Sequence, residues 1–263
     1  MMHTCHRLIT ALGAVFATAL LAQVATAAEN DAPVSDAPVY ELRIYTCEPG
    51  KLEPLLDRFR NHTMRIFEKH GMENVAYWVP TDEPKKSNTL IYILRHKSSD
   101  AAKASWQAFR DDPEWRAVAK ASAEQHGKIL ARRPDSRYMT ATDYSPKVTP
   151  PKENAVYELR IYTAAEGKLD ALHDRFRQHT DAIFKGHGMT STGYWAPRDA
   201  EAGNIMLYVL EYPDREAARD SWKAFFADPE WKKVAKQTQK DGRLVTKVES
   251  TYMVPTDFSP TAK

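Results

Sequence analysis

Most of the chain consists of one sequence unit that occurs twice. The recurring segments are Tyr-Glu-Leu-Arg-Ile-Tyr-Thr at 40–46 and 157–163, Asp-Pro-Glu-Trp at 112–115 and 228–231, and Thr-Asp-(Tyr/Phe)-Ser-Pro at 142–146 and 256–260. The offset between the copies falls from 117 to 114 positions, as small deletions in loops would produce. Because this period is too long for a solenoid repeat, the sequence predicts two small domains.

A proline-rich segment separates the two copies. It covers residues 147–155, and this composition is typical of a linker. We therefore expect a first domain at 39–146 and a second at 156–260. A chain of 263 residues is long enough for each domain to bury its own core.

Within each copy the pattern reads strand, helix, strand, strand, helix, strand. The first strand, 40–46, alternates, so that Glu41 and Arg43 lie on the face opposite to Leu42 and Ile44. This order predicts an α+β fold with two tandem ferredoxin-like βαββαβ domains, each an antiparallel sheet covered by helices on one face. A lone sheet of this kind leaves its other face and its edges exposed. We therefore expect the copies to stack sheet to sheet and to close into one barrel-like body.

Residues 1–27 read as a signal peptide. Arg7 precedes an apolar run from Leu8 to Ala22, and Ala25-Thr26-Ala27 matches the small-x-small pattern of a cleavage site. We expect cleavage after Ala27 and export, to the periplasm or the medium. The alternative is a short membrane anchor, for which a 15-residue apolar run is too short, and no permanent membrane span is predicted.

Charge and cysteine content exclude further classes. The 37 basic residues barely exceed the 35 acidic ones, so the chain lacks the positive excess of a nucleic-acid-binding protein. Of the two cysteines, Cys5 lies in the predicted signal peptide, and Cys47 alone cannot form an internal disulfide. Cys47 has no activating partner visible in the sequence, so we do not expect it to be a nucleophile.

The motifs of each copy resemble those of the NIPSNAP family. The resemblance rests on residues 40–45 with Gly50, on His70-Gly71, on Tyr77-Trp78 and on the segment 106–115, and it covers both copies. It implies an intramolecular version of the dimeric α/β-barrel. The wider superfamily includes small monooxygenases, haem-handling proteins and stress-response modules, so the fold alone does not define a function. The best-known NIPSNAP relatives are mitochondrial and act through partners; this chain departs from them in its secretion signal and its fused second copy.

Charged and aromatic residues on the strands are the main candidates for a ligand site. They are Glu41, Arg43, Tyr45, Trp78, Arg95, Glu158, Arg160, Tyr162, Trp195 and Glu211. We expect the first-strand residues among them to face the space between the two sheets. One interpretation is an ion-pair network that joins the halves, since buried charges are normally paired; the other is a ligand pocket, since an arginine fork suits a bound anion. Arg95 and Glu211 occupy matching positions with opposite charges, which predicts that they compensate each other.

Two histidine positions recur and form a weaker set of candidates. They are His62 with His179, and His70 with His187. His70 lies at the end of a predicted helix, where capping or packing is expected. His62 precedes it by eight residues, or ~12 Å of helix, so the two rings cannot share a metal. With no metal-binding motif in the sequence, neither a metal site nor a cofactor is predicted; haem needs one axial histidine, which leaves His62 and His179 open for that role.

Two functions remain open at this point. The first is an exported binding or assembly module, with a protein partner or a small organic ligand held between the two sheets, and with homo-oligomerisation left open. The second is a cofactor-light enzyme similar to the small α/β-barrel monooxygenases, which would use a pocket Tyr, Arg or His. The absence of phosphate-binding and Gly-x-Ser-x-Gly motifs disfavours nucleotide enzymes and serine hydrolases. A cavity with convergent polar groups would favour the enzyme, and a packed interior crossed by arginine–carboxylate pairs would favour the module.

Overall fold

A computed structural model describes residues 38–198 and 203–261, so the predicted signal peptide lies outside the described residues. The first copy contains β1 (Val39–Thr46), α1 (Leu52–Arg58), the π-helical turn η1 (Phe59–Thr63), α2 (Met64–Lys69), β2 (Glu73–Pro80), the 3-10 turn η2 (Lys85–Ser87), β3 (Thr89–His96), α3 (Ser99–Asp111), α4 (Pro113–His126) and β4 (Asp135–Ala141). The second copy contains β5 (Val156–Ala164), α5 (Leu169–Arg175), the π-helical turn η3 (Phe176–Thr180), α6 (Asp181–Gly186), β6 (Thr190–Pro197), β7 (Ile205–Tyr212), α7 (Arg215–Ala227), α8 (Pro229–Thr238) and β8 (Val245–Pro255).

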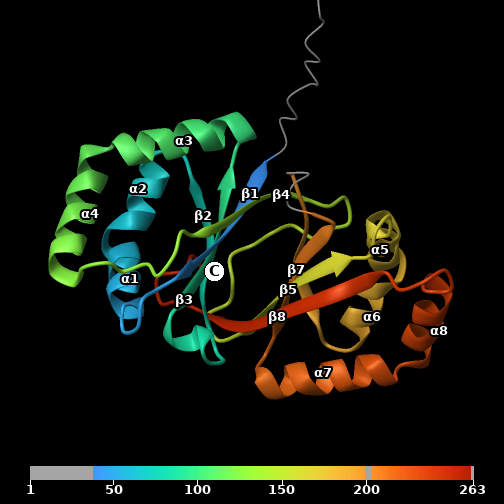
Figure 1. Ribbon diagram of the computed structural model, residues 1–263. Helices are drawn as coiled ribbons and strands as arrows, with labels where there is room; N and C mark the ends of the chain where they lie inside the picture. Colours follow the sequence, from blue (N-terminus) through green and yellow to red (C-terminus); the bar gives the residue numbers. More distant parts are fainter. Residues whose placement is uncertain (1–37, 199–202, 262–263) are drawn as a thin grey trace, which may run out of the picture. The chain divides into compact units, whose positions relative to one another are not determined.

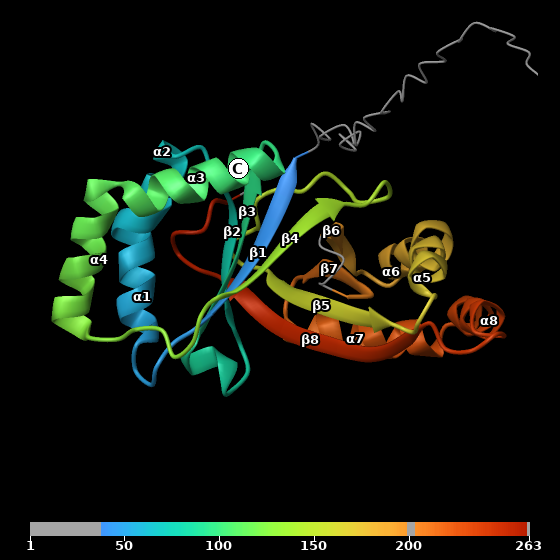
Figure 2. The ribbon, with the colours of Figure 1, turned by 45° about the horizontal axis from the view of Figure 1, so that its top comes forward.

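The strands of the two copies form a single closed antiparallel barrel in the order β1-β3-β2-β8-β5-β7-β6-β4. The copies join where β2 pairs with β8 and where β4 pairs with β6. The helices lie outside the barrel, with α1–α4 on one side and α5–α8 on the other (Figures 1 and 2). The expected fold class is therefore confirmed, and closure removes the sheet edges that a single copy would expose.

Apolar side chains from both copies fill the barrel interior. Tyr40 and Leu42 from β1 belong to this interior cluster together with their counterparts from β5. The ring of Trp78 lies 5.8 Å from that of Tyr157 in the other copy, and the ring of Trp195 lies 5.9 Å from that of Tyr40. Of the neighbouring Tyr77 and Trp78, Trp78 points into the barrel interior and Tyr77 belongs to the helix-covered layer.

Gly193 accommodates one of these tryptophans. A Cβ atom at this position would lie 2.2 Å from the indole ring of Trp195, well inside van der Waals contact. The first copy has Ala76 at the equivalent position, two residues before Trp78. The absence of a side chain at Gly193 therefore leaves the space that the six-membered ring of Trp195 occupies.

The Thr-Asp-(Tyr/Phe)-Ser-Pro segment of each copy, at 142–146 and 256–260, forms hydrogen bonds with the other copy. The backbone N–H of Thr256 donates to the carbonyl oxygen of Tyr77 (2.9 Å), and the backbone N–H of Tyr77 donates to Ser259 Oγ (3.0 Å). Arg60 holds the neighbouring Asp257 with two hydrogen bonds of 2.8 Å. The equivalent contacts in the opposite direction are Thr142 to Tyr194, Tyr194 to Ser145, and Arg177 to Asp143. These reciprocal contacts join the Thr-Asp-x-Ser-Pro segment of each copy to β2 and η1, or β6 and η3, of the other copy.

Each copy packs its helices on the outer face of its own strands. In the first copy this layer contains Phe59, Phe67 and Trp106 from the helices, with Tyr77 and Tyr92 from the sheet. Both faces of β1, β3, β5 and β7 are therefore covered, one by the helices and the other by the opposite wall of the barrel, whereas β8 is exposed over residues 246–250. Within the part of the chain that the structure describes, no helix combines the length and apolarity needed to cross a bilayer.

Candidate functional site

The charged residues of the first strands lie beneath the helices, and our prediction that they face the space between the sheets is wrong. Leu42 belongs to the barrel interior, whereas Glu41 and Arg43 point to the outer face and contact Trp106 of α3. The same helix-covered outer face also holds Tyr45, Tyr162, Glu158 and Arg160. Apolar residues of both copies fill the barrel interior at the level of Glu41 and Arg43. The helix-covered face instead offers hydrogen-bond donors and access to water at its margin.

Glu41 is the centre of a buried polar cluster in the first copy. Its carboxylate is fully buried and accepts hydrogen bonds from Arg43 Nη1 (2.6 Å), Trp106 Nε1 (2.7 Å) and Ser136 Oγ (2.6 Å), while His96 Nε2 lies 3.0 Å from Oε2. Burial alone would raise the pKa of Glu41, but the hydrogen bond from His96, the charge of Arg43 and the other two donors outweigh it. They lower the pKa to about 2, so the carboxylate is ionised at neutral pH.

The second copy repeats this cluster with one exchange. Glu158 is fully buried and bonded to Arg160, to Trp222 Nε1 (2.8 Å) and to Ser250 Oγ (2.6 Å). Tyr212 donates its hydroxyl to Glu158 (3.0 Å) from the position that His96 holds in the first copy. The two copies therefore share the carboxylate, arginine, tryptophan and serine and differ in the fourth partner.

These ion pairs do not join the two halves. Arg43 pairs with Glu41 on its own strand. Arg95 pairs with Glu73 (2.8 Å between Nε and Oε2), and Glu211 pairs with Lys152 (2.6 Å). The predicted compensation between Arg95 and Glu211 is therefore wrong, because each residue finds an opposite charge nearby.

An open cleft of about 500 Å³ lies beside the Glu41 cluster, between α3 and β4. Four cationic side chains line this α3–β4 cleft, together with aromatic and small residues; the lining is Arg43, Lys103, Trp106, Phe109, Arg110, Arg133, Pro134, Ser136 and Tyr138. The Arg43 guanidinium lies 4.4 Å from the Trp106 ring centre, and its side chain is 15% exposed. Among the described residues this lining contains no carboxylate. Arg43 is paired with Glu41 beneath the cleft and Lys103 contacts Asp100, so Arg110 and Arg133 present the unpaired positive charge to solvent.

The equivalent α7–β8 cleft of the second copy, about 710 Å³, has a different charge pattern. Phe226 occupies the position of Arg110. Arg219 is paired with Glu216 (2.9 Å) and with Asp220 (3.2 Å). In the α3–β4 cleft Lys103 has a 3.3 Å contact with Asp100, while Arg110 and Arg133 form no ion pair with any residue in the described ranges. The first copy therefore carries the larger uncompensated positive charge.

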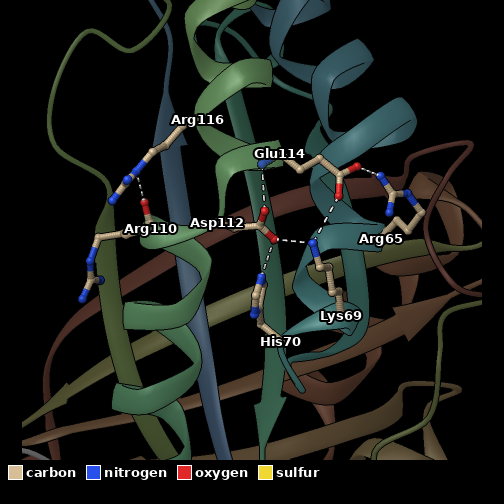
Figure 3. Close-up of polar contacts among 7 residues, drawn as sticks. All are labelled: Arg65, Lys69, His70, Arg110, Asp112, Glu114 and Arg116. Atoms are coloured by element: carbon tan, nitrogen blue, oxygen red, sulfur yellow. Dashed lines mark hydrogen bonds and ion pairs between the residues drawn. The ribbon is translucent and has the colours of Figure 1, made fainter.

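The recurring histidines link helices. His70 Nε2 lies 2.6 Å from Asp112 Oδ2, and Asp112 caps α4 by accepting the N–H of Glu114 (2.8 Å). Lys69 Nζ also contacts Asp112 (2.8 Å), and Figure 3 shows both side chains converging on this carboxylate. The hydrogen bonds from Lys69 and His70 hold the pKa of Asp112 well below its usual range. His187 and Asp228 repeat the contact at 2.6 Å.

His62 and His179 lie in the π-helical turns, away from the Glu41 cluster. His62 is exposed and His179 is half-buried. Among the residues described here, no group of three or more His, Cys, Asp or Glu side chains is placed to hold a metal ion. Cys47 is 2% exposed, and burial raises the pKa of its thiol to about 11.

The barrel interior at the level of Trp78 and Trp195 has little free space. The cavity there measures about 20 Å³, enough for about one water molecule. Trp78 and Trp195 therefore act as packing residues at this end of the barrel, and they leave no room beside them for an organic ligand.

Sequence reasoning missed three residues of the Glu41 cluster as site residues: Trp106, His96 and Ser136. The repeat contained a signal for the serine, because Ser136-x-Tyr138-Met139 recurs as Ser250-x-Tyr252-Met253. His96 had no such signal, since the second copy has Tyr212 at the same place. Only the fold brings His96 to the buried carboxylate of the neighbouring strand.

Two βαββαβ units that close one barrel define a dimeric α/β-barrel protein whose two halves belong to one chain. The NIPSNAP family model matches residues 40–146 and 157–260, and the chain belongs to the NIPSNAP family, with two tandem NIPSNAP domains. A search of curated protein sequences found no match.

Solved structures share this fold at low sequence identity. A proposed monooxygenase from Fusobacterium nucleatum is 13% identical with a TM-score of 0.54, over 84% of this chain and 93% of that one. A proposed monooxygenase from Lactobacillus acidophilus is 10% identical with a TM-score of 0.52, over 83% and 94%. A NIPSNAP-like domain protein from Burkholderia xenovorans is 21% identical with a TM-score of 0.37, over 42% and 93%. At such identities the likeness to the monooxygenase-like structures extends to the fold alone.

Proposed function

We propose that this protein is an exported binding module that holds a small organic anion in the α3–β4 cleft of its first copy. The observation that carries this proposal is the combination of four cationic side chains with an aromatic floor in a lining that, over the residues the structure describes, has no carboxylate. Export belongs to the proposal and rests on the signal-peptide pattern of residues 1–27.

The Glu41 cluster supports this function because it preorganises Arg43. The guanidinium is fixed between the Glu41 carboxylate and the Trp106 ring, so little side-chain entropy remains to be lost when an anion binds. Arg43 donates to Glu41 and to the Tyr45 hydroxyl (3.3 Å), so it supplies a fixed, partly exposed guanidinium. The forks of Arg110 and Arg133 suit carboxylate and phosphate groups. Arg110 and Arg133 add charge at the rim, and Trp106 and Tyr138 offer surface for a planar organic body. The expected ligand is therefore an aromatic or other compact anion with more than one negative charge.

The second candidate is an enzyme that uses the same cleft, and the similarity to structures described as monooxygenases favours it. The ionisation of the cleft residues makes it the weaker candidate. Burial, and then the charge of Glu41, raise the pKa of Tyr138 to about 12, so its hydroxyl is protonated at neutral pH. Tyr138, Ser136 and Arg43 can donate hydrogen bonds to a developing oxyanion, but none of them is placed to act as a general base.

Calorimetry with benzene-1,3,5-tricarboxylate as the probe tests the binding function. Affinity should rise from benzoate through isophthalate to the tricarboxylate, and it should fall with added salt, because surface charges are screened. Arg110→Phe introduces the residue that the second copy already carries and should weaken binding about fivefold, the effect of losing one partly exposed ion pair of about 1 kcal/mol.

The matched control is Arg219→Phe, which removes an exposed arginine from the equivalent helix of the second copy and should leave binding unchanged. Equal affinity for all three probes, or a loss confined to Arg219→Phe, would contradict the assignment to the first copy. The enzyme would become the favoured function if the wild-type protein consumed dioxygen in the presence of hydroquinone faster than buffer alone and the Tyr138→Phe variant did not.

A further inference from the structure

A second pocket lies at the end of the barrel where β1 and β5 finish. We call it the barrel-mouth pocket; it is more enclosed than the α3–β4 cleft and measures about 190 Å³. Its floor consists of Ile44 and Ile91 from the first copy and Leu159 and Ile161 from the second. Because both copies supply the floor, the pocket exists only in the closed barrel. It is separate from the α3–β4 cleft, which lies on the outer, helix-covered face.

The strand register explains why polar groups surround this apolar floor. Asp135 pairs with Ile44, and Arg137 lies two residues further along β4, so both side chains share the inward face at the mouth. On the opposite wall, Glu249 pairs with Ile161 in the same way. The inward face thus changes from apolar to charged within two residues of the barrel end.

The charges at this rim are not balanced. Arg137 has a single 3.4 Å contact with Asp135, and its buried Nε atom has no hydrogen-bond partner among the described residues. Glu249 is already paired with Lys247 at 2.8 Å. Lys85 donates to the hydroxyl of Thr251 at 2.8 Å, across the boundary between the copies. The described lining carries three cationic side chains, Lys85, Arg132 and Arg137, against two carboxylates, Asp135 and Glu249. Lys85 and Arg132 have no carboxylate partner in the described ranges, so the rim keeps positive charge for an incoming anion.

We propose that the barrel-mouth pocket binds a short monocarboxylate, with its hydrocarbon part on the isoleucine and leucine floor and its carboxylate at Arg137 and Lys85. The volume sets the size of the ligand: an apolar cavity of about 150 Å³ accepts benzene, so a pocket of about 190 Å³ fits a chain or ring of roughly six to eight non-hydrogen atoms. This ligand is smaller and less charged than the one expected in the α3–β4 cleft. The proposal does not depend on the function assigned to that cleft.

Isoleucine methyl NMR tests the proposal, with hexanoate as the probe. The δ1-methyl signals of Ile44, Ile91 and Ile161 should shift in a saturable way, at concentrations up to about 10 mM. Ile66 and Ile183 belong to the helix layers of the two copies and serve as internal controls whose signals should not move. Hexanol has the same chain without the charge and should bind at least about tenfold more weakly, since a charge-assisted hydrogen bond is lost.

Two variants separate this site from the α3–β4 cleft. Arg137→Thr installs the residue that the second copy carries at the equivalent position, Thr251, and should weaken hexanoate binding about tenfold. Arg110→Phe should leave hexanoate binding unchanged, and Arg137→Thr should leave binding of the benzenetricarboxylate unchanged. Unmoved signals from Ile44, Ile91 and Ile161, equal binding of hexanol, or wild-type affinity in Arg137→Thr would overturn the proposal.

Discussion

Replacing the buried carboxylate of the first copy, Glu41→Gln, should destabilise the protein by about 3 kcal/mol at pH 7. Two routes lead to this magnitude. One pKa unit corresponds to about 1.4 kcal/mol, so lowering the pKa of Glu41 from 4.5 to about 2 stabilises the folded state by about 3 kcal/mol. Independently, removing one partner of a buried ion pair costs about 3–5 kcal/mol, and Arg43 would lose its only carboxylate within the described residues.

The pH dependence of this difference follows from the sign of the pKa change. Because the folded-state pKa is lowered, the stabilisation is fully present above pH 4.5 and is lost as the pH falls toward 2. Urea unfolding of the wild type and of Glu41→Gln should therefore show a gap of about 3 kcal/mol at pH 7 that narrows below pH 4.5. Glu53→Gln, a change at an exposed helix position, is the control and should stay within about 0.5 kcal/mol of the wild type. A gap below about 1 kcal/mol at pH 7, or one that does not change with pH, would refute the reasoning.

Three further predictions concern packing and reactivity. Gly193→Ala should destabilise the protein by about 1–3 kcal/mol in urea unfolding, because the new methyl group would overlap the Trp195 ring; an unchanged midpoint would show that the ring moves freely. Ser259→Ala leaves the buried N–H of Tyr77 without its acceptor and should lower the free energy of unfolding by about 1–3 kcal/mol. Ser145→Ala, the same change in the first copy, should have the same effect through the N–H of Tyr194. With the cysteine of the N-terminal segment replaced by serine, the thiol of Cys47 should react with Ellman's reagent at pH 8 only after unfolding, because it is buried and its pKa is about 11; rapid reaction of the native protein would contradict this.

Much of the architecture could be predicted from residue order. The repeat marked two units, and the alternation of Tyr40–Thr46 followed by a helical pattern predicted the strands and helices that the structure shows. Because a lone βαββαβ sheet would leave its edges exposed, we predicted that the two copies close into a barrel, and this prediction is confirmed. The repeated Thr-Asp-x-Ser-Pro segment was visible in the sequence, but its contact with the other copy was not, since Ser259 and Tyr77 are 182 positions apart.

The sequence by itself determined the two copies, the order of their elements and the two faces of each strand. Only the tertiary structure decided which face Glu41 and Arg43 occupy. Alternation assigns residues to two faces, but it does not show which face the helices cover and which face the opposite barrel wall covers. Both faces are covered here. The middle of the barrel interior is filled by apolar residues, and charged side chains line it only at the mouth. The helix layer supplies the indole N–H of Trp106 and opens to water beside α3. The charged pair of Glu41 and Arg43 is therefore more stable under the helices than it would be in the middle of the barrel. The two clefts and the barrel-mouth pocket form only where segments that are distant in the sequence meet.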